Sequence, residues 1–121
     1  MKCLVVDDSA TMRRIVVNAL KSIGVTDVVE AGDGRQALEA WDPSIELVIT
    51  DWDMPVMGGL DVVRAFRANP ATARTPVLMV TTRSGQGYIM QAVEAGVTGY
   101  ILKPFTAQIL RDKISQVTAA A

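Results

Sequence analysis

Short runs of consecutive apolar residues recur along the chain and are separated by longer segments in which apolar residues follow a helical period. The runs are Cys3 to Val6, Val28-Val29, Leu47 to Ile49, Val77 to Val80 and Tyr100 to Leu102. A short run that is apolar on both faces is typical of a strand buried in a parallel sheet. The pattern therefore predicts five buried strands.

The segment after the first run has the clearest helical period. Its apolar residues follow the i, i+3, i+4, i+7 spacing of an amphipathic helix. They are Met12, Ile15, Val16, Ala19, Leu20 and Ile23. Ser9 is a candidate N-cap, and Gly24 offers a stop just past the last periodic residue. We predict a helix between these two residues, with its apolar face packed on the sheet.

Four more helices are predicted after the other strands. Their apolar markers are Ala37, Leu38 and Trp41; Leu60, Val63 and Phe66; Ile89, Ala92 and Val93; and Leu110, Ile114 and Val117. Asp33 is expected to cap the first of these helices, with Gln36 returning a hydrogen bond. Thr106 is expected to cap the last, with Phe105 facing Leu110 in a hydrophobic staple. The expected stops are Pro43, Asn69-Pro70 and Gly96.

The alternation of strands and helices with short connections predicts an α/β fold. Right-handed crossovers place helices on both faces of one parallel sheet. We expect a doubly wound sheet of five strands and five helices in the flavodoxin-like strand order 2-1-3-4-5. The chain has 121 residues, which fits one domain over residues 1–121.

Composition and charge exclude several functional classes. Twelve Lys and Arg against thirteen Asp and Glu give a net charge of −1, which is too balanced for direct nucleic-acid binding. Histidine is absent and cysteine occurs once, so the usual zinc sites, histidine-based catalysis and an internal disulfide are excluded. The apolar runs are far shorter than the roughly 20 residues that cross a bilayer. No signal peptide is visible, so we expect a cytoplasmic location without membrane contact.

Acidic side chains collect where predicted strands end, which is where doubly wound sheets bind ligands. Asp7 and Asp8 follow the first strand, and Asp51 follows the third. These strands are neighbours about 4.8 Å apart in the predicted order, so the three carboxylates form one cluster. Each ionised pair at about 5 Å repels by roughly 3 kcal/mol at an effective dielectric of ~20. A hard divalent cation relieves this repulsion, and oxygen-only ligands select Mg²⁺ or Mn²⁺.

A basic residue is expected to complete this cluster from the other side. Lys103 follows the fifth strand, roughly 10 Å across the sheet from the carboxylates. Its ammonium group can return to them only if the fourth strand ends in small residues, and that strand is followed by Thr81 and Thr82. We therefore predict that Lys103 reaches the acidic cluster.

Four segments resemble the receiver domain of two-component response regulators, and most closely its chemotaxis members. They are Leu4 to Val17, Thr50 to Gly59, Pro76 to Thr82 and Gly99 to Thr106. They occur in the family's order and spacing, and the resemblance extends over essentially the whole chain. It implies a regulator that is phosphorylated on an aspartate and is not an enzyme beyond catalysing its own phosphorylation and dephosphorylation.

The resemblance also assigns roles to the acidic residues. Asp51 would be the phosphoacceptor. Asp8 and Asp51 would bind Mg²⁺ directly, together with the main-chain carbonyl of Asp53. Asp7 would help to position the metal through water.

Further roles implied by the resemblance concern the phosphoryl group and the switch. Thr81 and Lys103 would contact the phosphoryl oxygens, and the Lys103-Pro104 bond would be cis. As a hypothesis, the Thr81 hydroxyl moves toward the new phosphoryl group and Tyr100 swings inward into the vacated space. This change would remodel the face made by the fourth helix, the fifth strand and the fifth helix, where the output partner binds.

The resemblance implies partners as well. The phosphoryl donor would be a phosphohistidine on a sensor histidine kinase of the chemotaxis type, which agrees with the absence of histidine in this chain. The output partner would be the flagellar motor switch protein, and a phosphatase is a further candidate. We expect the chain to act as a monomer. An alternative is that it is a receiver excised from a longer regulator.

Three departures from the family pattern are visible. Gly58-Gly59 stands where such receivers often have Asp-Gly, and two others, at Asp53 and Arg83, leave the lifetime of the acyl phosphate open. Asp53 stands where chemotaxis receivers often have Asn, and Arg83 stands where they often have an acidic residue; Arg83 can pair with Asp53 or with the phosphate. Asp51 and Asp53 also resemble the Asp-x-Asp motif of haloacid-dehalogenase-like phosphatases, with a nucleophile followed by a general acid/base. A flavodoxin-like FMN carrier is a weaker alternative, because Asp7 and Asp8 occupy the loop that would hold its phosphate.

Overall fold

Five parallel strands form the centre of the computed structural model, which describes residues 1–119. In chain order they are β1 (Lys2–Val6), β2 (Asp27–Ala31), β3 (Leu47–Thr50), β4 (Val77–Thr81) and β5 (Gly99–Leu102). Their order across the sheet is β2-β1-β3-β4-β5, and each adjacent pair is parallel. The predicted fold class and strand order are therefore confirmed.

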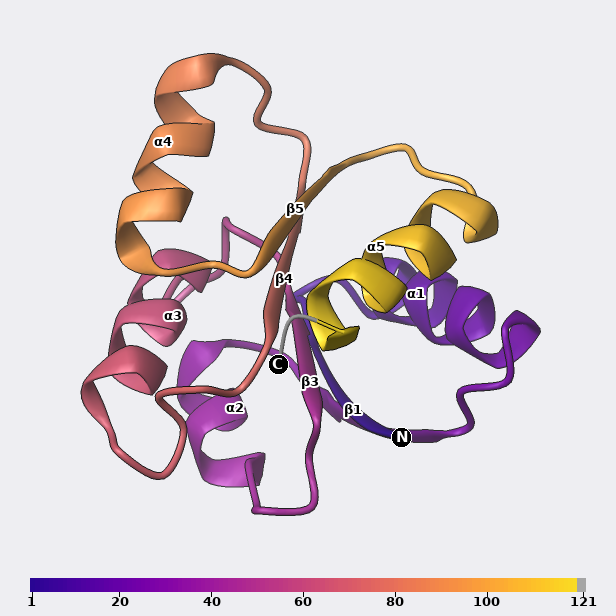
Figure 1. Ribbon diagram of the computed structural model, residues 1–121, viewed down its shortest axis with the longest axis horizontal. Helices are drawn as coiled ribbons and strands as arrows, with labels where there is room; N and C mark the ends of the chain where they lie inside the picture. The colour runs from indigo at the N-terminus through magenta and orange to yellow at the C-terminus, as the bar shows by residue number, and fades with distance from the viewer. Residues whose placement is uncertain (120–121) are drawn as a thin grey trace.

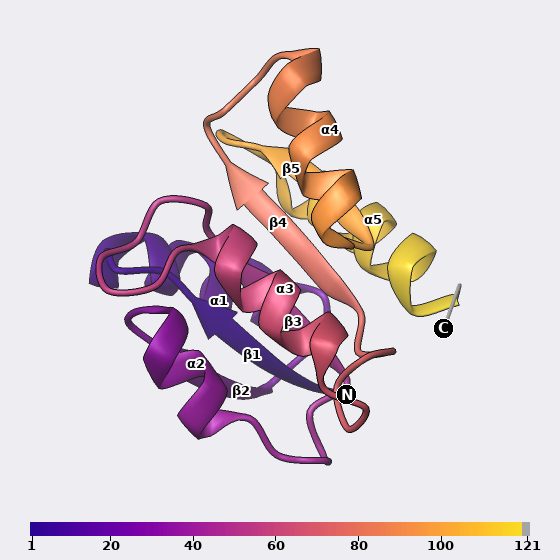
Figure 2. The same ribbon diagram turned by 90° about the vertical axis from the view of Figure 1, so that its left-hand side faces the viewer.

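Helices cover both faces of this sheet (Figures 1 and 2). One face carries α1 (Ala10–Ser22) and α5 (Ala107–Ala119), and the other carries α2 (Gly34–Ala40), α3 (Gly59–Ala68) and α4 (Gln86–Ala95). Strand side chains alternate between the faces, so Cys3 and Val5 pack with α1 and α5 while Leu4 and Val6 pack with α2 and α3. Among residues 1–119, none of the helices combines the length and apolarity needed to cross a bilayer.

The predicted caps explain where α1 and α2 begin and end. The Ser9 hydroxyl accepts a 3.2 Å hydrogen bond from the N3 amide of α1, and Gly24 follows that helix with φ +90°. The Asp33 carboxylate accepts a 2.8 Å bond from the amide of Gln36. The predicted return bond between the Gln36 side chain and the amide of Asp33 is wrong. The side-chain oxygen of Gln36 accepts a 2.8 Å bond from the amide of Gly32 instead.

The predicted cap of α5 is confirmed, whereas the predicted end of α2 is wrong. The Thr106 hydroxyl accepts a 3.2 Å bond from the N3 amide of α5, as expected, and Phe105 packs against the core cluster that contains Leu110. Trp41 lies outside α2, with an extended backbone at φ −65° and ψ 139°. Pro43 disfavours helical backbone at Asp42, and α2 ends still earlier, at Ala40.

Several residues predicted to be buried are exposed or half-buried. Val28 and Val29 are half-buried and Leu102 is 43% exposed, because β2 and β5 are the edge strands and have a neighbour on one side only. On the helices, Ile15 is 47% exposed and Val93 is 62% exposed. Periodicity identified these helices correctly, but it overestimated how much of their apolar faces the sheet covers.

Val56 has an unfavourable backbone conformation in the loop between β3 and α3. Its φ is 68°, in the left-handed region where a β-branched side chain is strained. The side chain is 79% exposed, so little packing compensates for this strain.

We expect Val56→Asn to raise the free energy of unfolding by about 1 kcal/mol, because Asn tolerates the left-handed conformation better than Val. Urea denaturation measures this difference. The matched control is Val93→Asn at an exposed position in α4, which removes the same side chain from ordinary helical backbone and should give no gain. An unchanged or lower stability of Val56→Asn would show that the loop carries no such strain.

Candidate phosphoacceptor site

The three predicted acidic residues converge at the carboxyl edge of the sheet. Asp7 and Asp8 directly follow β1, and Asp51 directly follows the neighbouring strand β3. One carboxylate oxygen from each lies within 4.8 Å of the other two. Asp7 is 4% exposed, Asp51 is half-buried and Asp8 is exposed. The cluster is therefore open to solvent on the side of Asp8.

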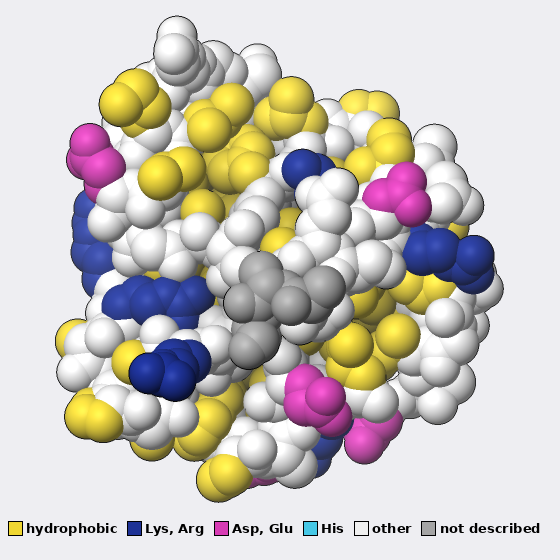
Figure 3. Space-filling view, viewed as in Figure 1, with side chains coloured by type: hydrophobic (Ala, Val, Ile, Leu, Met, Phe, Trp, Pro, Cys, Tyr) yellow, Lys and Arg dark blue, Asp and Glu magenta, His cyan; other side chains and the backbone are white. Residues whose placement is uncertain are grey.

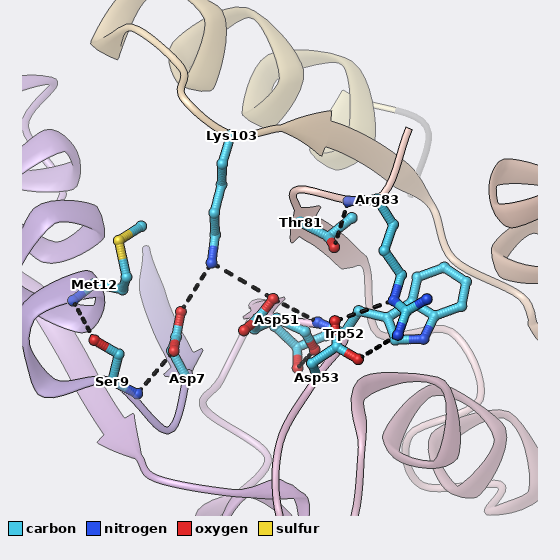
Figure 4. Close-up of polar contacts among 10 residues, drawn as sticks. Asp7, Ser9, Met12, Asp51, Trp52, Asp53, Thr81, Arg83 and Lys103 are labelled. Atoms are coloured by element: carbon cyan, nitrogen blue, oxygen red, sulfur yellow. Dashed lines mark hydrogen bonds and ion pairs between the residues drawn. The ribbon is translucent and has the colours of Figure 1, made fainter. Parts of the chain in front are cut away.

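Lys103 reaches this cluster from β5, as Figure 4 shows. Its Nζ lies 3.2 Å from Asp7 Oδ2 and 3.5 Å from Asp51 Oδ1, and its side chain is 12% exposed. The intervening strand β4 ends in Thr81, which is fully buried. The small end residue predicted to let the lysine pass is thus in place, and the Lys103-Pro104 bond is cis as expected.

Main-chain and side-chain donors fix Asp7. The amide of Ser9, at the start of α1, donates a 2.9 Å hydrogen bond to Asp7 Oδ1. The guanidinium of Arg13 donates a 2.6 Å bond to the main-chain carbonyl of Asp7 and pairs with Glu30 on β2 at 3.2 Å. The turn that carries Asp7 and Asp8 is therefore tied to both α1 and β2.

The loop after β3 fixes Asp51. The amide of Trp52 donates a 2.8 Å hydrogen bond to Asp51 Oδ1. The loop then closes on the first residue of α3, where the Gly59 amide donates a 2.9 Å bond to the Trp52 carbonyl. A Cβ atom on Gly59 would lie only 2.0 Å from the carbonyl oxygen of Asp51. Any side chain at this position would displace the loop that carries Asp51.

The environment of Asp51 raises the pKa of its carboxyl group above the ordinary value. Burial is the main cause, the negative charge of Asp7 adds to it, and the Lys103 ammonium opposes it. The ionised group is thus held at an energetic cost in the absence of a cation.

We expect Asp51→Asn to stabilise the metal-free protein near neutral pH, on the order of 1 kcal/mol. Because the folded-state pKa of Asp51 is raised, the folded protein binds this proton more tightly than the unfolded chain does. The stability that this bound proton contributes is therefore lost as pH rises from the pKa of Asp51 in the unfolded chain to its pKa in the folded protein. The advantage of the variant should grow through that interval and stay constant above it.

Urea denaturation in EDTA over a series of pH values measures this advantage. The control is Asp27→Asn, which removes an exposed carboxylate from β2. A variant at Asp51 that is less stable than the parent at neutral pH would contradict the repulsion described here.

The ligand atoms in the cluster suit a hard divalent cation. Asp7, Asp8 and Asp51 offer oxygen only, and the described residues contain no histidine while the cysteine is buried on β1. Carboxylate oxygens select Mg²⁺ or Mn²⁺ over zinc. With so few protein ligands and an open side, such a site has room for water and for a phosphoryl oxygen.

Arg83 pairs with Asp53 at the rim of the site. Two guanidinium nitrogens donate to the carboxylate, Nε at 3.0 Å and Nη2 at 2.6 Å. This hydrogen bonding lowers the pKa of Asp53 below its ordinary value and raises the pKa of Arg83. The sequence left the partner of Arg83 open, and the structure assigns Asp53.

This pair also bears on the phosphatase alternative. A general acid/base at Asp53 needs a carboxyl group that gains and loses a proton near neutral pH. With its pKa lowered by Arg83 and both oxygens engaged, Asp53 stays ionised. The arrangement therefore does not support the Asp51/Asp53 chemistry of haloacid-dehalogenase-like phosphatases.

Thr81 and Tyr100 both contact the main chain of Arg83. Thr81 Oγ1 accepts a 3.1 Å hydrogen bond from the Arg83 amide, and the Tyr100 hydroxyl donates a 2.7 Å bond to the Arg83 carbonyl. The Tyr100 ring packs against the core, 6.5 Å from the Trp52 ring between centroids. Tyr100 is half-buried here, and the movement of its ring on phosphorylation stays a prediction.

Two residues at the site were missed by the sequence analysis. Arg13 supports the Asp7 turn, and Tyr88 stacks on Arg83 at the start of α4, with its ring centroid 5.0 Å from Arg83 Cζ. For Arg13, the available signal was a basic residue one turn after the Ser9 cap, on the side of the acidic turn. No comparable signal existed for Tyr88, because its contact depends on the path of the loop after β4.

Comparisons with known proteins agree with this geometry. The family model for the response regulator receiver domain matches residues 3–115. The chain is 47% identical over 118 residues to a chemotaxis protein CheY of Pseudomonas aeruginosa, covering 97% of this chain and 95% of the relative. It is also 47% identical over 119 residues to chemotaxis protein CheY1 of Helicobacter pylori, covering 97% and 96%.

A solved structure supports the same assignment at the level of the fold. The chemotaxis protein CheY4 of Vibrio cholerae superposes with a TM-score of 0.87 at 36% identity, covering 96% of this chain and 97% of that one. An acidic cluster such as Asp7, Asp8 and Asp51 is typical of the magnesium site of receivers. The fold, the site and these relatives together show that the chain belongs to the response regulator receiver family, whose members are signalling domains and not conventional enzymes.

Proposed function

We propose that this chain is a chemotaxis response regulator that is controlled by phosphorylation of Asp51. The observation that carries the proposal is the surroundings of the Asp51 carboxylate. It lies within 4.8 Å of carboxylate oxygens of Asp7 and Asp8, and 3.5 Å from Lys103 Nζ. A carboxylate held beside a cation site and an ammonium group is positioned to accept a phosphoryl group, because both neutralise the charge on the phosphoryl oxygens.

In the proposed step, one oxygen of Asp51 attacks phosphorus and forms a new O–P bond. The bond from phosphorus to the leaving nitrogen or oxygen of the donor breaks at the same time. A leaving imidazole takes a proton from solvent, and a leaving acetate departs as the anion. The ammonium of Lys103 and the hydroxyl of Thr81 would contact the phosphoryl oxygens. The Thr81 oxygen accepts from the Arg83 amide, which uses a lone pair and leaves the hydroxyl proton for this contact.

The acidic residues would hold Mg²⁺ in this step. Asp8 and Asp51 would bind it directly with the main-chain carbonyl of Asp53, and Asp7 would position it through water. When bound, the cation supplies charge neutralisation and orientation of the phosphoryl oxygens. The bonds from Ser9 and Arg13 that fix the Asp7 turn support this role.

Two observations support the proposed partners: the similarity of this chain to chemotaxis proteins, and the apolar side chains exposed on its surface. The phosphoryl donor would be a phosphohistidine on a sensor histidine kinase, and the output partner would be the flagellar motor switch protein. Apolar side chains gather over α4 and β5 in Figure 3. The large exposed ones on α4, β5 and α5 are Tyr88, Ile89, Met90, Val93, Leu102 and Ile109. A face of this kind suits a partner protein.

Acetyl phosphate with Mg²⁺ tests this proposal by intact-mass measurement. We expect one phosphoryl group on each parent chain, and none on Asp51→Asn or on the parent in EDTA. A peptide from a flagellar motor switch protein should then bind more tightly to the phosphorylated parent. Equal phosphoryl uptake by Asp51→Asn, or continuous rapid hydrolysis of a phosphate monoester, would overturn it.

Phosphorylation of the parent is expected to raise its affinity for the peptide about tenfold, because allosteric coupling of this kind is typically 5- to 150-fold. Thr81→Ala should still be phosphorylated but should lose most of this gain. The variant removes the hydroxyl that would connect the phosphoryl group to the Arg83 amide. Isothermal titration with and without acetyl phosphate measures the gain. Thr82→Ala, at the exposed neighbouring position, should retain it; a full gain in Thr81→Ala would argue against the switch.

A further inference from the structure

Arg83 lies at the centre of a side-chain cluster that joins the β3–α3 loop to α4. Besides its two hydrogen bonds to Asp53, at 3.0 and 2.6 Å, it packs on two aromatic rings. Its Cζ lies 5.3 Å from the centroid of Trp52 and 5.0 Å from that of Tyr88. The two rings meet edge to face at 5.8 Å between centroids. We refer to Asp53, Trp52, Arg83 and Tyr88 as the arginine cluster.

Little else holds the first turn of α4. Ala92, in the second half of the helix, is its one buried residue. The helix begins after Gly85, which has φ +113°, and Gly87 lies in the first turn. At the other end, Arg67 donates a 2.9 Å bond to the carbonyl of Gly96. The C-terminal end of α4 is thus anchored to α3, whereas its N-terminal turn is held by the contacts of Tyr88 with Arg83 and Trp52.

We propose that the arginine cluster is a latch, which holds the first turn of α4 against the β3–α3 loop until phosphorylation of Asp51 draws Arg83 away from Asp53. The inference rests on the proposed phosphorylation of Asp51. It adds a route from the site to α4 through the side chain of Arg83, whereas the route through Thr81 and Tyr100 involves the Arg83 main chain.

The chemistry of the new group explains why the latch would open. Phosphorylation replaces the single negative charge of the Asp51 carboxylate by about two charges on the phosphoryl oxygens, two residues away from Asp53. The guanidinium matches phosphate oxygens at least as well as a carboxylate, through the same two-nitrogen fork. A guanidinium that turns toward the phosphoryl group leaves the faces of Trp52 and Tyr88, and the first turn of α4 then keeps only the edge contact of Tyr88 with Trp52.

Release of the first turn of α4 would change the part of the exposed apolar face that lies on the N-terminal half of this helix. Tyr88 is 40% exposed, and Ile89 and Met90 follow it on the same helix at 37% and 53%. Freedom of the first turn therefore alters the relative positions of these three side chains. A partner that binds this face would distinguish the latched protein from the released one.

Amide hydrogen exchange over residues 86–95 tests the latch without phosphorylation. In the unphosphorylated protein, Arg83→Met and Asp53→Asn should each speed exchange in the first turn of α4 about fivefold, the effect expected for loss of an exposed ion pair and cation–π contacts. The double variant should be no faster than Arg83→Met, because both changes break one unit. The control is Arg35→Met, which removes an arginine from the exposed pair with Glu39 on α2 and should leave α4 unchanged.

A second arm adds acetyl phosphate and Mg²⁺, with phosphoryl uptake followed by intact mass. Exchange in the first turn of the wild-type α4 should rise toward the level of Arg83→Met, and the variant itself should change less than twofold. Unchanged α4 exchange in unphosphorylated Arg83→Met would overturn the latch. Phosphoryl uptake by the wild type without a change in α4 would also overturn it while leaving the proposed function intact, whereas absence of uptake would refute the proposed function.

Discussion

Lys103→Met is expected to slow phosphorylation of Asp51 by acetyl phosphate at least a hundredfold at saturating Mg²⁺. Loss of one preorganised charged or hydrogen-bonding group at a developing charge typically costs a factor of about 10² to 10³ in rate. Lys103 Nζ is the ammonium group nearest the acceptor, at 3.5 Å from Asp51 Oδ1, with 12% of its side chain exposed. Water is poorly placed to replace it.

Stopped-flow fluorescence of Trp52, whose amide bonds the Asp51 carboxylate, gives the rate. The matched control is Lys21→Met on the exposed side of α1, which removes the same charge from the protein as a whole. That control should react at the parent's rate. If Lys103→Met phosphorylates within a few-fold of the parent, the ammonium does not act on the phosphoryl group.

Arg67→Met is expected to lower the free energy of unfolding by about 3 kcal/mol, the cost of leaving several half-buried carbonyl groups without a donor. The guanidinium of Arg67 donates to main-chain carbonyls in two loops. Its acceptors include Gly96 at 2.9 Å, after α4, and Thr75 at 2.7 Å, before β4. It also reaches the hydroxyl of Thr98 at 3.3 Å. Partial burial lowers the pKa of Arg67.

Arg64→Met is the matched control, one turn earlier on α3. Arg64 pairs with Asp61 at 3.5 Å, and both side chains are more than half exposed, so its loss should cost less than about 1 kcal/mol. Urea denaturation of both variants gives the comparison. Equal midpoints for the two variants would mean that the loop carbonyls find water and that Arg67 does not hold the loops together.

The acidic cluster is predictable from the sequence because its geometry follows from the backbone. Asp7 comes directly after an apolar run and Asp51 one residue after another, and parallel strands bring their carboxyl ends to one edge. The reach of Lys103 follows in the same way, since a small residue at Thr81 decides whether its stem can cross β4. These features need only the strand order, which short right-handed connections restrict.

The arginine cluster is not predictable in this way. Asp53 and Arg83 are 30 residues apart in the chain, and both lie in loops whose paths depend on packing. An arginine beside an acidic site can pair with any carboxylate or with the ligand. Only the position of the loop after β4 brings Arg83 against the rings of Trp52 and Tyr88.

Burial of the helices is likewise only partly encoded in the local pattern. The spacing of Ile89, Ala92 and Val93 predicted a helix, and α4 is there, but only Ala92 is buried. The same spacing on α1 includes Ile15, which is 47% exposed. Exposed apolar side chains on a helix follow the same helical spacing as buried ones. The sequence therefore does not distinguish a helix face that binds a partner from one that packs in the core.

Chemical mapping of the phosphoryl group tests the role of Asp51 at the level of single residues. Borohydride reduces an aspartyl phosphate to homoserine, which peptide mass spectrometry locates in the chain. After treatment with acetyl phosphate and Mg²⁺, we predict homoserine at position 51 alone, at up to one per chain and absent without Mg²⁺. Homoserine at position 7, 8 or 53, or a phosphoryl group that survives on a hydroxyl side chain, would contradict Asp51 as the acceptor.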